Sequence, residues 1–188
     1  MFTITSYNQF FRTAAIWHVD IEHNVTAEGQ DGPVAECGFY IGIDKAINGI
    51  RTQTRPDKCT LIVLKYEAKG TDNGAFDYRG LYTGGFIICK AADISNSAEV
   101  EAVEAITEET AWDIINLIIQ KMVNPIDGLH CLSPFGEVSM NDVRMTHVGP
   151  FVDKQFGWLV EFDFLIEKNT LINPERVVEK FFVPPAFP

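Results

Sequence analysis

The alternation of apolar and polar positions is most regular late in the chain, between residues 141 and 167. Apolar side chains there occupy every second position and point to one face: Phe156, Trp158, Val160, Phe162, Phe164 and Ile166. The opposite face is less apolar and carries Gly157, Leu159, Glu161, Asp163, Leu165 and Glu167. A period of two over eleven residues is typical of a β-strand with one buried face. We therefore predict strands at about 142–148 and 156–167, with the apolar face lying under a helix.

Two further strands are predicted in the middle of the chain. Residues 60–68 (TLIVLKYEA) are rich in β-branched and aromatic side chains, and residues 81–90 (LYTGGFIICK) follow a turn-rich connector at 70–80. Because the connector is short, the two strands should pair antiparallel. Gly84 and Gly85 inside the second strand indicate a β-bulge or a close approach of another segment.

A first helix is predicted at residues 6–18, because apolar side chains recur there at spacings of three and four. Ser6 and Gln9 fit a capping box at its start. The apolar positions of this helix are Tyr7, Phe10, Phe11, Ala14 and Trp17.

The longest helix is predicted at residues 97–123. Asn96 fits its N-terminal cap with Glu99 at the third position, and glutamates crowd its first half, where the helix dipole favours negative charge. Asn124 and Pro125 should end it. An apolar stripe for packing on a sheet is formed by Val100, Val103, Ile106, Ile114, Leu117 and Ile118.

These elements predict an α+β fold in which a mostly four-stranded antiparallel sheet packs against the long helix and the N-terminal helix. We expect one domain over residues 1–170, in which the polar loop 24–36 is a candidate contact arm. Residues 171–188 are expected to form a C-terminal extension.

Composition and charge narrow the classes of partner. Hydrophobic residues make up 46% of the 188 residues, as in a folded domain, and no apolar run approaches the length of about 20 residues that crosses a membrane. The net charge of −11, from 26 acidic and 15 basic residues, disfavours a specific grip on nucleic acid. An acidic wall along which DNA slides without sticking is compatible with this charge, although a solvated acidic surface is the commoner explanation. The four cysteines form no CxxC pair and are expected to be reduced.

No residue pattern predicts a catalytic, cofactor or metal site. His18 and His23 are five residues apart, which is poor spacing for two metal ligands on one helix face. Glu161 and Asp163 share a face of the last strand, where an outward polar surface is favoured over a pair of catalytic acids. If the chain has an unrecognised pocket, His130, Cys131 and Glu137 are its best candidates.

The last eight residues, 181–188 (FFVPPAFP), are rich in phenylalanine and proline. Such a segment cannot form a regular helix or a central strand, and its aromatic side chains are unfavourable in water. We therefore expect it to be buried against a neighbouring subunit. The candidate interface residues are Phe181, Phe182, Pro184, Pro185 and Phe187.

The order of elements resembles the tail-terminator, or tail-completion, proteins of tailed bacteriophages and of contractile injection systems. The likeness covers roughly residues 6–167 and is one of pattern. It is carried by SYNQFFRTAAIWH, by TLIVLKYEA, by the long helix and by DVRMTHVGPFVDKQFGWLVEFDFLI. The regions through Arg55 and beyond Glu167 are longer than a minimal member needs, so a different neck or tail ring fits almost as well.

The resemblance implies a structural virion protein without enzymatic activity. Such proteins form a homo-oligomeric ring, commonly a hexamer, that caps the tail tube and joins it to the neck and head. The implied partners are further copies of the chain and other tail and neck proteins, with DNA passing through unbound. The implied location is the virion, after assembly in the host cytoplasm.

Two other classes remain open from the sequence. One is a small ligand-binding or enzymatic α+β domain with an unrecognised pocket. The other is a non-viral adaptor that binds a partner through its C-terminal peptide.

Overall fold

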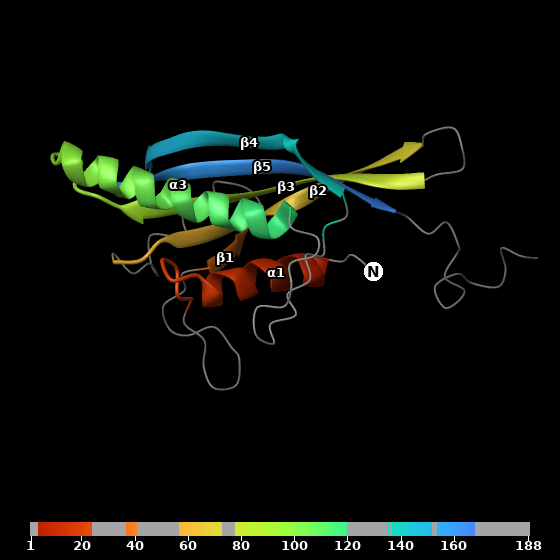
Figure 1. Cartoon of the computed structure of the whole chain (residues 1–188), viewed down its shortest axis with the longest axis horizontal. Coiled ribbons are helices and arrows are strands. Elements are labelled where there is room, and N and C mark those ends of the chain that lie inside the picture. Colours follow the sequence, from red (N-terminus) through yellow and green to blue (C-terminus); the bar gives the residue numbers. More distant parts are fainter. Residues whose placement is uncertain are drawn as a thin grey trace, which may run out of the picture.

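The computed structural model describes residues 4–23, 37–40, 57–72, 78–119, 135, 137–151 and 154–167. These residues form two helices and five strands (Figure 1). In chain order they are α1 Ile4–Trp17, β1 Cys37–Tyr40, β2 Thr60–Asp72, β3 Tyr78–Ala91, α3 Ser97–Ile119, β4 Glu137–Phe151 and β5 Gln155–Glu167. The strands form one sheet in the order β1-β2-β3-β5-β4. Four of them are antiparallel, as predicted, and β1 adds a short parallel edge beside β2.

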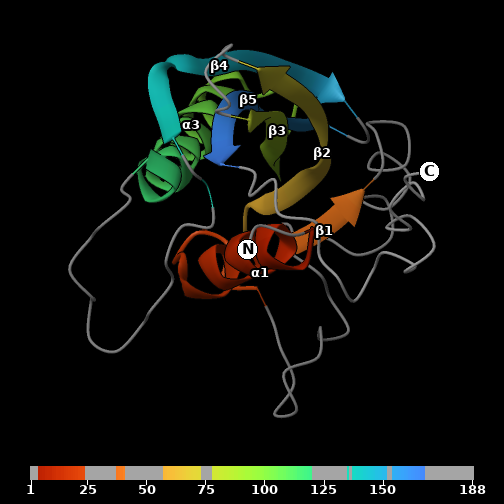
Figure 2. The ribbon, with the colours of Figure 1, turned by 90° about the vertical axis from the view of Figure 1, so that its right-hand side faces the viewer.

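The two helices lie on the same face of a curved sheet (Figure 2). Phe11 and Ala15 of α1 and Ile114 of α3 belong to one buried cluster with Phe86 and Val160 of the sheet. The α+β class predicted from the pattern is therefore confirmed.

The alternation along β5 places its side chains as predicted. Phe162 and Phe164 are at most 2% exposed and lie in the core under the helices. Trp158 is partly buried there, and its indole N–H donates to the backbone carbonyl of Glu104 in α3 at 3.2 Å. The opposite face is not uniformly polar, because Leu159 packs there against a second small cluster of buried residues.

Gly84 and Gly85 lie at a close approach beside a bulge. Leu64 pairs with Gly85 and Glu67 pairs with Thr83, so β2 has one more residue than β3 at this point. A β-carbon on Gly84 would lie 2.8 Å from a ring carbon of Phe162 and 3.1 Å from the Tyr7 hydroxyl. Both features expected from the glycine pair are therefore present, with the extra residue on the opposite strand.

The first helix differs in detail from its prediction. It begins at Ile4, so Ser6 lies inside it and the predicted capping box is wrong. Trp17 was assigned to the buried stripe but is 63% exposed, while Ala15 is fully buried. The helix ends at Trp17 and the chain turns inward to bury Ile21, which leaves the indole outside.

The long helix keeps its predicted cap but not its whole stripe. The Asn96 side-chain oxygen accepts the Glu99 backbone N–H at 3.3 Å. Leu117 is 41% exposed, whereas Thr107 and Thr110 are fully buried. Burial of these threonines is favourable because each hydroxyl donates to a carbonyl of its own helix at 2.8 Å.

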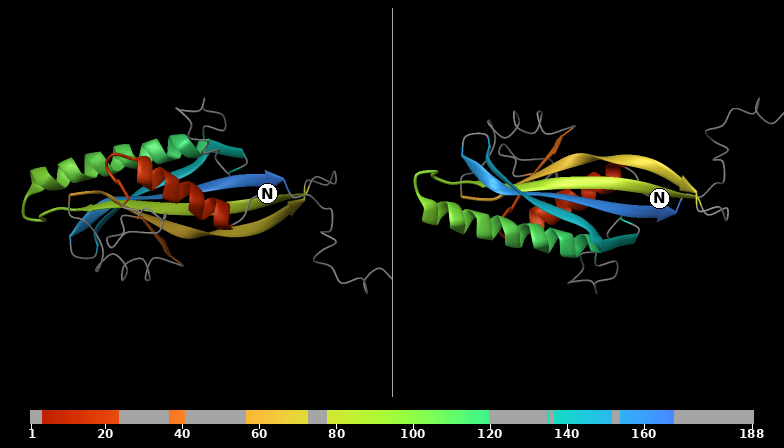
Figure 3. Two further views of the ribbon diagram at one scale, coloured as in Figure 1. Left: turned by 90° about the horizontal axis from the view of Figure 1, so that it is seen from below. Right: turned by 90° about the horizontal axis from the view of Figure 1, so that it is seen from above.

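The predicted connector at 70–80 is largely strand. β2 continues to Asp72 and β3 begins at Tyr78, so the two strands form a long ribbon that projects past the helices (Figure 3). The short strand β1, Cys37–Tyr40, was not among the strands predicted above. The loop 24–36, the helix end at 120–125 and the C-terminal extension lie outside the described residues.

Candidate functional site on the outer face of the sheet

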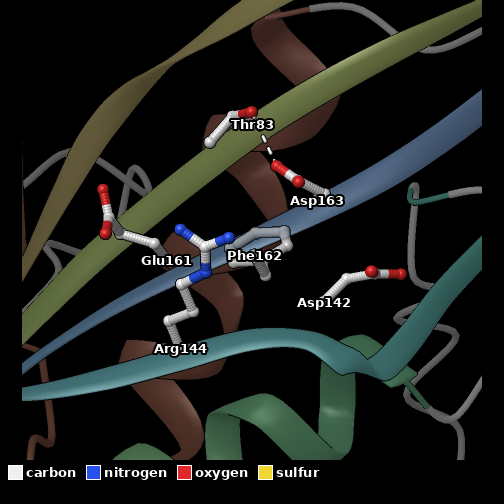
Figure 4. A pocket seen from close by; sticks show the side chains of 6 residues that line it. All are labelled: Thr83, Asp142, Arg144, Glu161, Phe162 and Asp163. Carbon is white, nitrogen blue, oxygen red and sulfur yellow. Dashed lines mark hydrogen bonds between the residues drawn. The ribbon is translucent and has the colours of Figure 1, made fainter.

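A pocket of about 150 Å³ lies on the sheet face that points away from the helices (Figure 4). The strand register builds it, because Arg144 of β4 lies opposite Glu161 of β5, and Thr83 of β3 lies opposite Asp163. Its lining residues are Thr83, Asp142, Arg144, Glu161, Phe162 and Asp163.

An irregularity in β4 brings a third carboxylate to this pocket. Val138 pairs with Phe164 and Val143 with Phe162, so residues 139–142 together face a single position of β5. The strand bulges outward there, and Asp142 lines the pocket.

The pocket is polar and carries a net negative charge. The Thr83 hydroxyl donates to an Asp163 carboxylate oxygen at 2.6 Å. The Arg144 guanidinium reaches over β5 beside Glu161, yet it forms no ion pair within 4.0 Å among the described residues (Figure 4). One guanidinium and three carboxylates give a formal charge of −2. Such a surface favours a cation or a basic side chain of a partner.

Glu161 and Asp163 are thus part of an outward polar face, as the alternation favoured. Residues two positions apart on a strand are separated by roughly 6.5 Å, and each of these two faces a different partner across the sheet. The register of β5 with β3 and β4 determines where the two carboxylates lie on this surface. Sequence reasoning could not place Thr83, Asp142 or Arg144 beside them, because strand register was unknown.

The described histidines connect elements of the fold. His18 Nε2 of the α1 end lies 3.3 Å from Asp113 Oδ2 of α3, and His147 Nε2 of β4 lies 2.8 Å from Glu104 Oε1 of α3. His23 is buried. No group of three potential metal ligands occurs within the described ranges. His18 and His23 both follow the end of α1 at Trp17.

Cys59 and Cys89 are free thiols buried in the core. Burial raises the pKa of Cys59 from 9.0 to about 11, and burial also raises the pKa of Cys89. Both side chains are therefore protonated and weakly nucleophilic at neutral pH.

Several predicted site residues cannot be placed. His130 and Cys131 lie outside the described residues, and Glu137 is the first residue of β4. The candidate interface residues also lie outside: Phe181, Phe182, Pro184, Pro185 and Phe187.

Sequence comparison leaves the family open. The chain matches no protein-family model and no curated protein sequence. Neither described helix is long and apolar enough to cross a bilayer.

Proposed function

We propose that this chain is a ring-forming structural protein of a phage tail or contractile injection machine. Its role would be that of a tail terminator, or of a neck and tail connector, that caps the tail tube and joins it to the head. The α+β fold agrees with the resemblance in the order of elements. The acidic chain and the acidic outer pocket agree with a ring through which DNA passes unbound.

The observation that carries this proposal is the open edge of the sheet at β4. Within the described part of the chain, β4 pairs only with β5, so one side of a 15-residue strand has unpaired backbone groups. Such an edge is a template for pairing with another chain. The bulge at 139–142 and Pro150, which lacks an N–H, restrict regular pairing to about the stretch 143–148. A short edge of defined register suits a specific contact between subunits.

Light scattering over a range of concentrations, together with negative-stain electron microscopy, tests this proposal. We expect a closed oligomer of about six chains, and hydrogen exchange should show that every second amide of 143–148, those that point away from β5, becomes protected when it forms. The amides of β5 are the internal control, because they are paired in the single chain. A strict monomer at every concentration would overturn the proposal.

The pocket around Arg144 favours one alternative, which is a small ligand-binding domain. The Arg144 guanidinium has no ion-pair partner among the described residues and lies beside three carboxylates, which fits a small zwitterion that carries both an ammonium and a carboxylate. A thermal-shift screen with amino acids tests this, with Arg144→Ala as the matched control. Stabilisation of the parent chain that disappears in Arg144→Ala would favour this alternative.

A further inference from the structure

The stretch 143–148 of β4 is a short pairing segment at the edge of the sheet. Its register with β5 is continuous from Val143 to Val148 and shifts on both sides of that stretch. None of the residues in the stretch is buried. By contrast, Val160 and Phe162, which pair with it from β5, are at most 2% exposed. Each contact that fixes this edge segment therefore has a large share in its local stability.

A hydrogen bond from His147 ties the segment to the helix layer. His147 Nε2 lies 2.8 Å from Glu104 Oε1 of α3. Because an ionised carboxylate only accepts hydrogen bonds, Nε2 is the donor. Within the described part of the chain, no other hydrogen bond or ion pair joins a β4 side chain to α3.

Trp158 of β5 contacts both partners of this bond. Its indole N–H donates to the backbone carbonyl of Glu104 at 3.2 Å, and that carbonyl also accepts the Thr107 hydroxyl at 3.0 Å. The Trp158 and His147 rings meet edge to face, with centroids 5.5 Å apart. One residue from each of α3, β5 and β4 thus meets at a single place. We call His147, Trp158 and Glu104 the β4 anchor.

We propose that the β4 anchor preorganises the edge strand for pairing with a neighbouring copy of the chain. This inference rests on the proposed function, in which the stretch 143–148 is the template for the contact between subunits. A strand that is already extended and fixed loses less conformational entropy on pairing than a strand that frays. His147 is then a positioning residue, because its side chain contacts α3 and β5 while its backbone belongs to the edge.

The anchor fixes the strand without covering its edge. Val143 and Met145 pack against the main core and share the helix side of the sheet with His147. Arg144 lines the pocket on the opposite face. The backbone N–H and C=O groups of a strand point sideways in the plane of the sheet, between these two rows of side chains. The anchor therefore leaves the pairing groups of β4 accessible to a partner strand.

Hydrogen exchange of the dilute, monomeric chain tests the anchor itself. The amides of 143–148 that point toward β5 should exchange about three- to tenfold faster in His147→Ala, because loss of a partly shielded hydrogen bond makes local opening easier. His147→Gln keeps an N–H donor and should restore most of the protection. His18→Ala is the matched control, because it removes a bond from histidine to Asp113 of the same helix and should leave these amides unchanged.

A double-mutant cycle with Glu104→Ala shows whether the bond itself is the cause. If it is, exchange in His147→Ala/Glu104→Ala should be no faster than in the more affected single variant. Effects of the two substitutions that multiply would mean that the side chains act independently, and would overturn the proposal. Equal exchange in His147→Ala and the parent chain would overturn it as well.

Assembly of the same variants separates this inference from the proposed function. Light scattering should show that His147→Ala needs about three- to tenfold more protein for half-assembly, while His147→Gln and His18→Ala assemble like the parent chain. Faster exchange with unchanged assembly would refute preorganisation and leave the ring. A parent chain that stays monomeric, while His147→Ala still exchanges faster, would refute the proposed function and show only that the anchor fixes β4.

Discussion

Replacement of Tyr7 by phenylalanine tests how α1 is fastened to the sheet. The Tyr7 hydroxyl is fully buried and donates to the carbonyl of Leu64 at 3.0 Å. It also accepts the Gly85 N–H at 3.3 Å. These backbone groups lie beside the bulge, where the ladder between β2 and β3 is interrupted. Burial raises the pKa of Tyr7, so the hydroxyl is neutral and able to donate.

The size of the effect follows from what the substitution leaves behind. The phenylalanine ring keeps the packing against Phe11, but a partly buried carbonyl and a buried N–H both lose a partner. A stranded buried group costs about 1–3 kcal/mol, and the second bond here is the longer one. We therefore expect the free energy of unfolding to fall by about 2–3 kcal/mol, and Tm to fall by roughly 4–12 °C for a chain of this size.

Urea unfolding followed by circular dichroism measures this change, and the slope with urea should stay constant. Thr13→Val is the matched control, because it removes an exposed hydroxyl bond on the same helix and should change stability by less than about 0.5 kcal/mol. If the unfolding free energies of Tyr7→Phe and Thr13→Val differ by less than about 0.5 kcal/mol, the hydrogen bonds of the Tyr7 hydroxyl beside the bulge do not stabilise the fold.

Three further changes test the core, the buried thiol and the sheet. Ile118→Ala should lower the free energy of unfolding by about 2–5 kcal/mol, because the Ile118 side chain is buried. Leu117→Ala, at the exposed neighbouring position, should change the free energy of unfolding by less than about 0.5 kcal/mol. Equal losses in urea unfolding would contradict the burial of Ile118. The pKa of Cys59 is raised to about 11, so the unfolded chain loses that proton first and the unfolding free energy should fall between pH 9 and 11, by up to roughly 2–3 kcal/mol. In Cys59→Ala the unfolding free energy should fall less steeply between pH 9 and 11. An unchanged dependence on pH would mean that the Cys59 thiol does not cause the fall. Gly157→Ala should prevent stable folding, as judged by circular dichroism, because its β-carbon would overlap the Ile88 carbonyl oxygen; a native-like Tm would refute that contact.

Local patterns determined which segments are strands and helices. The period of two along β5 and the apolar spacing of α1 and α3 follow from backbone geometry alone, which is the same in every protein. The cap at Asn96 was predictable for the same reason, since it involves groups only three residues apart. These local rules sufficed for the fold class.

The tertiary structure decided which side chains meet. The order that places β5 between β3 and β4 brings Thr83, Arg144 and Asp163 to one pocket, although they are far apart in the chain. The exposure of Trp17 depends on where the chain turns after α1, and helical spacing alone assigned it to the core.

Gly84 and Gly85 illustrate the difference between what the local sequence predicts and what tertiary contacts decide. The sequence by itself determined that Gly84 and Gly85 mark an unusual place in a strand, because glycine is unfavourable there without a reason. Only the folded chain identified that reason, which is the Tyr7 hydroxyl and the Phe162 ring pressed against the backbone. Contacts between residues 78 positions apart leave no periodic trace in the sequence, since they depend on packing and not on repeat geometry.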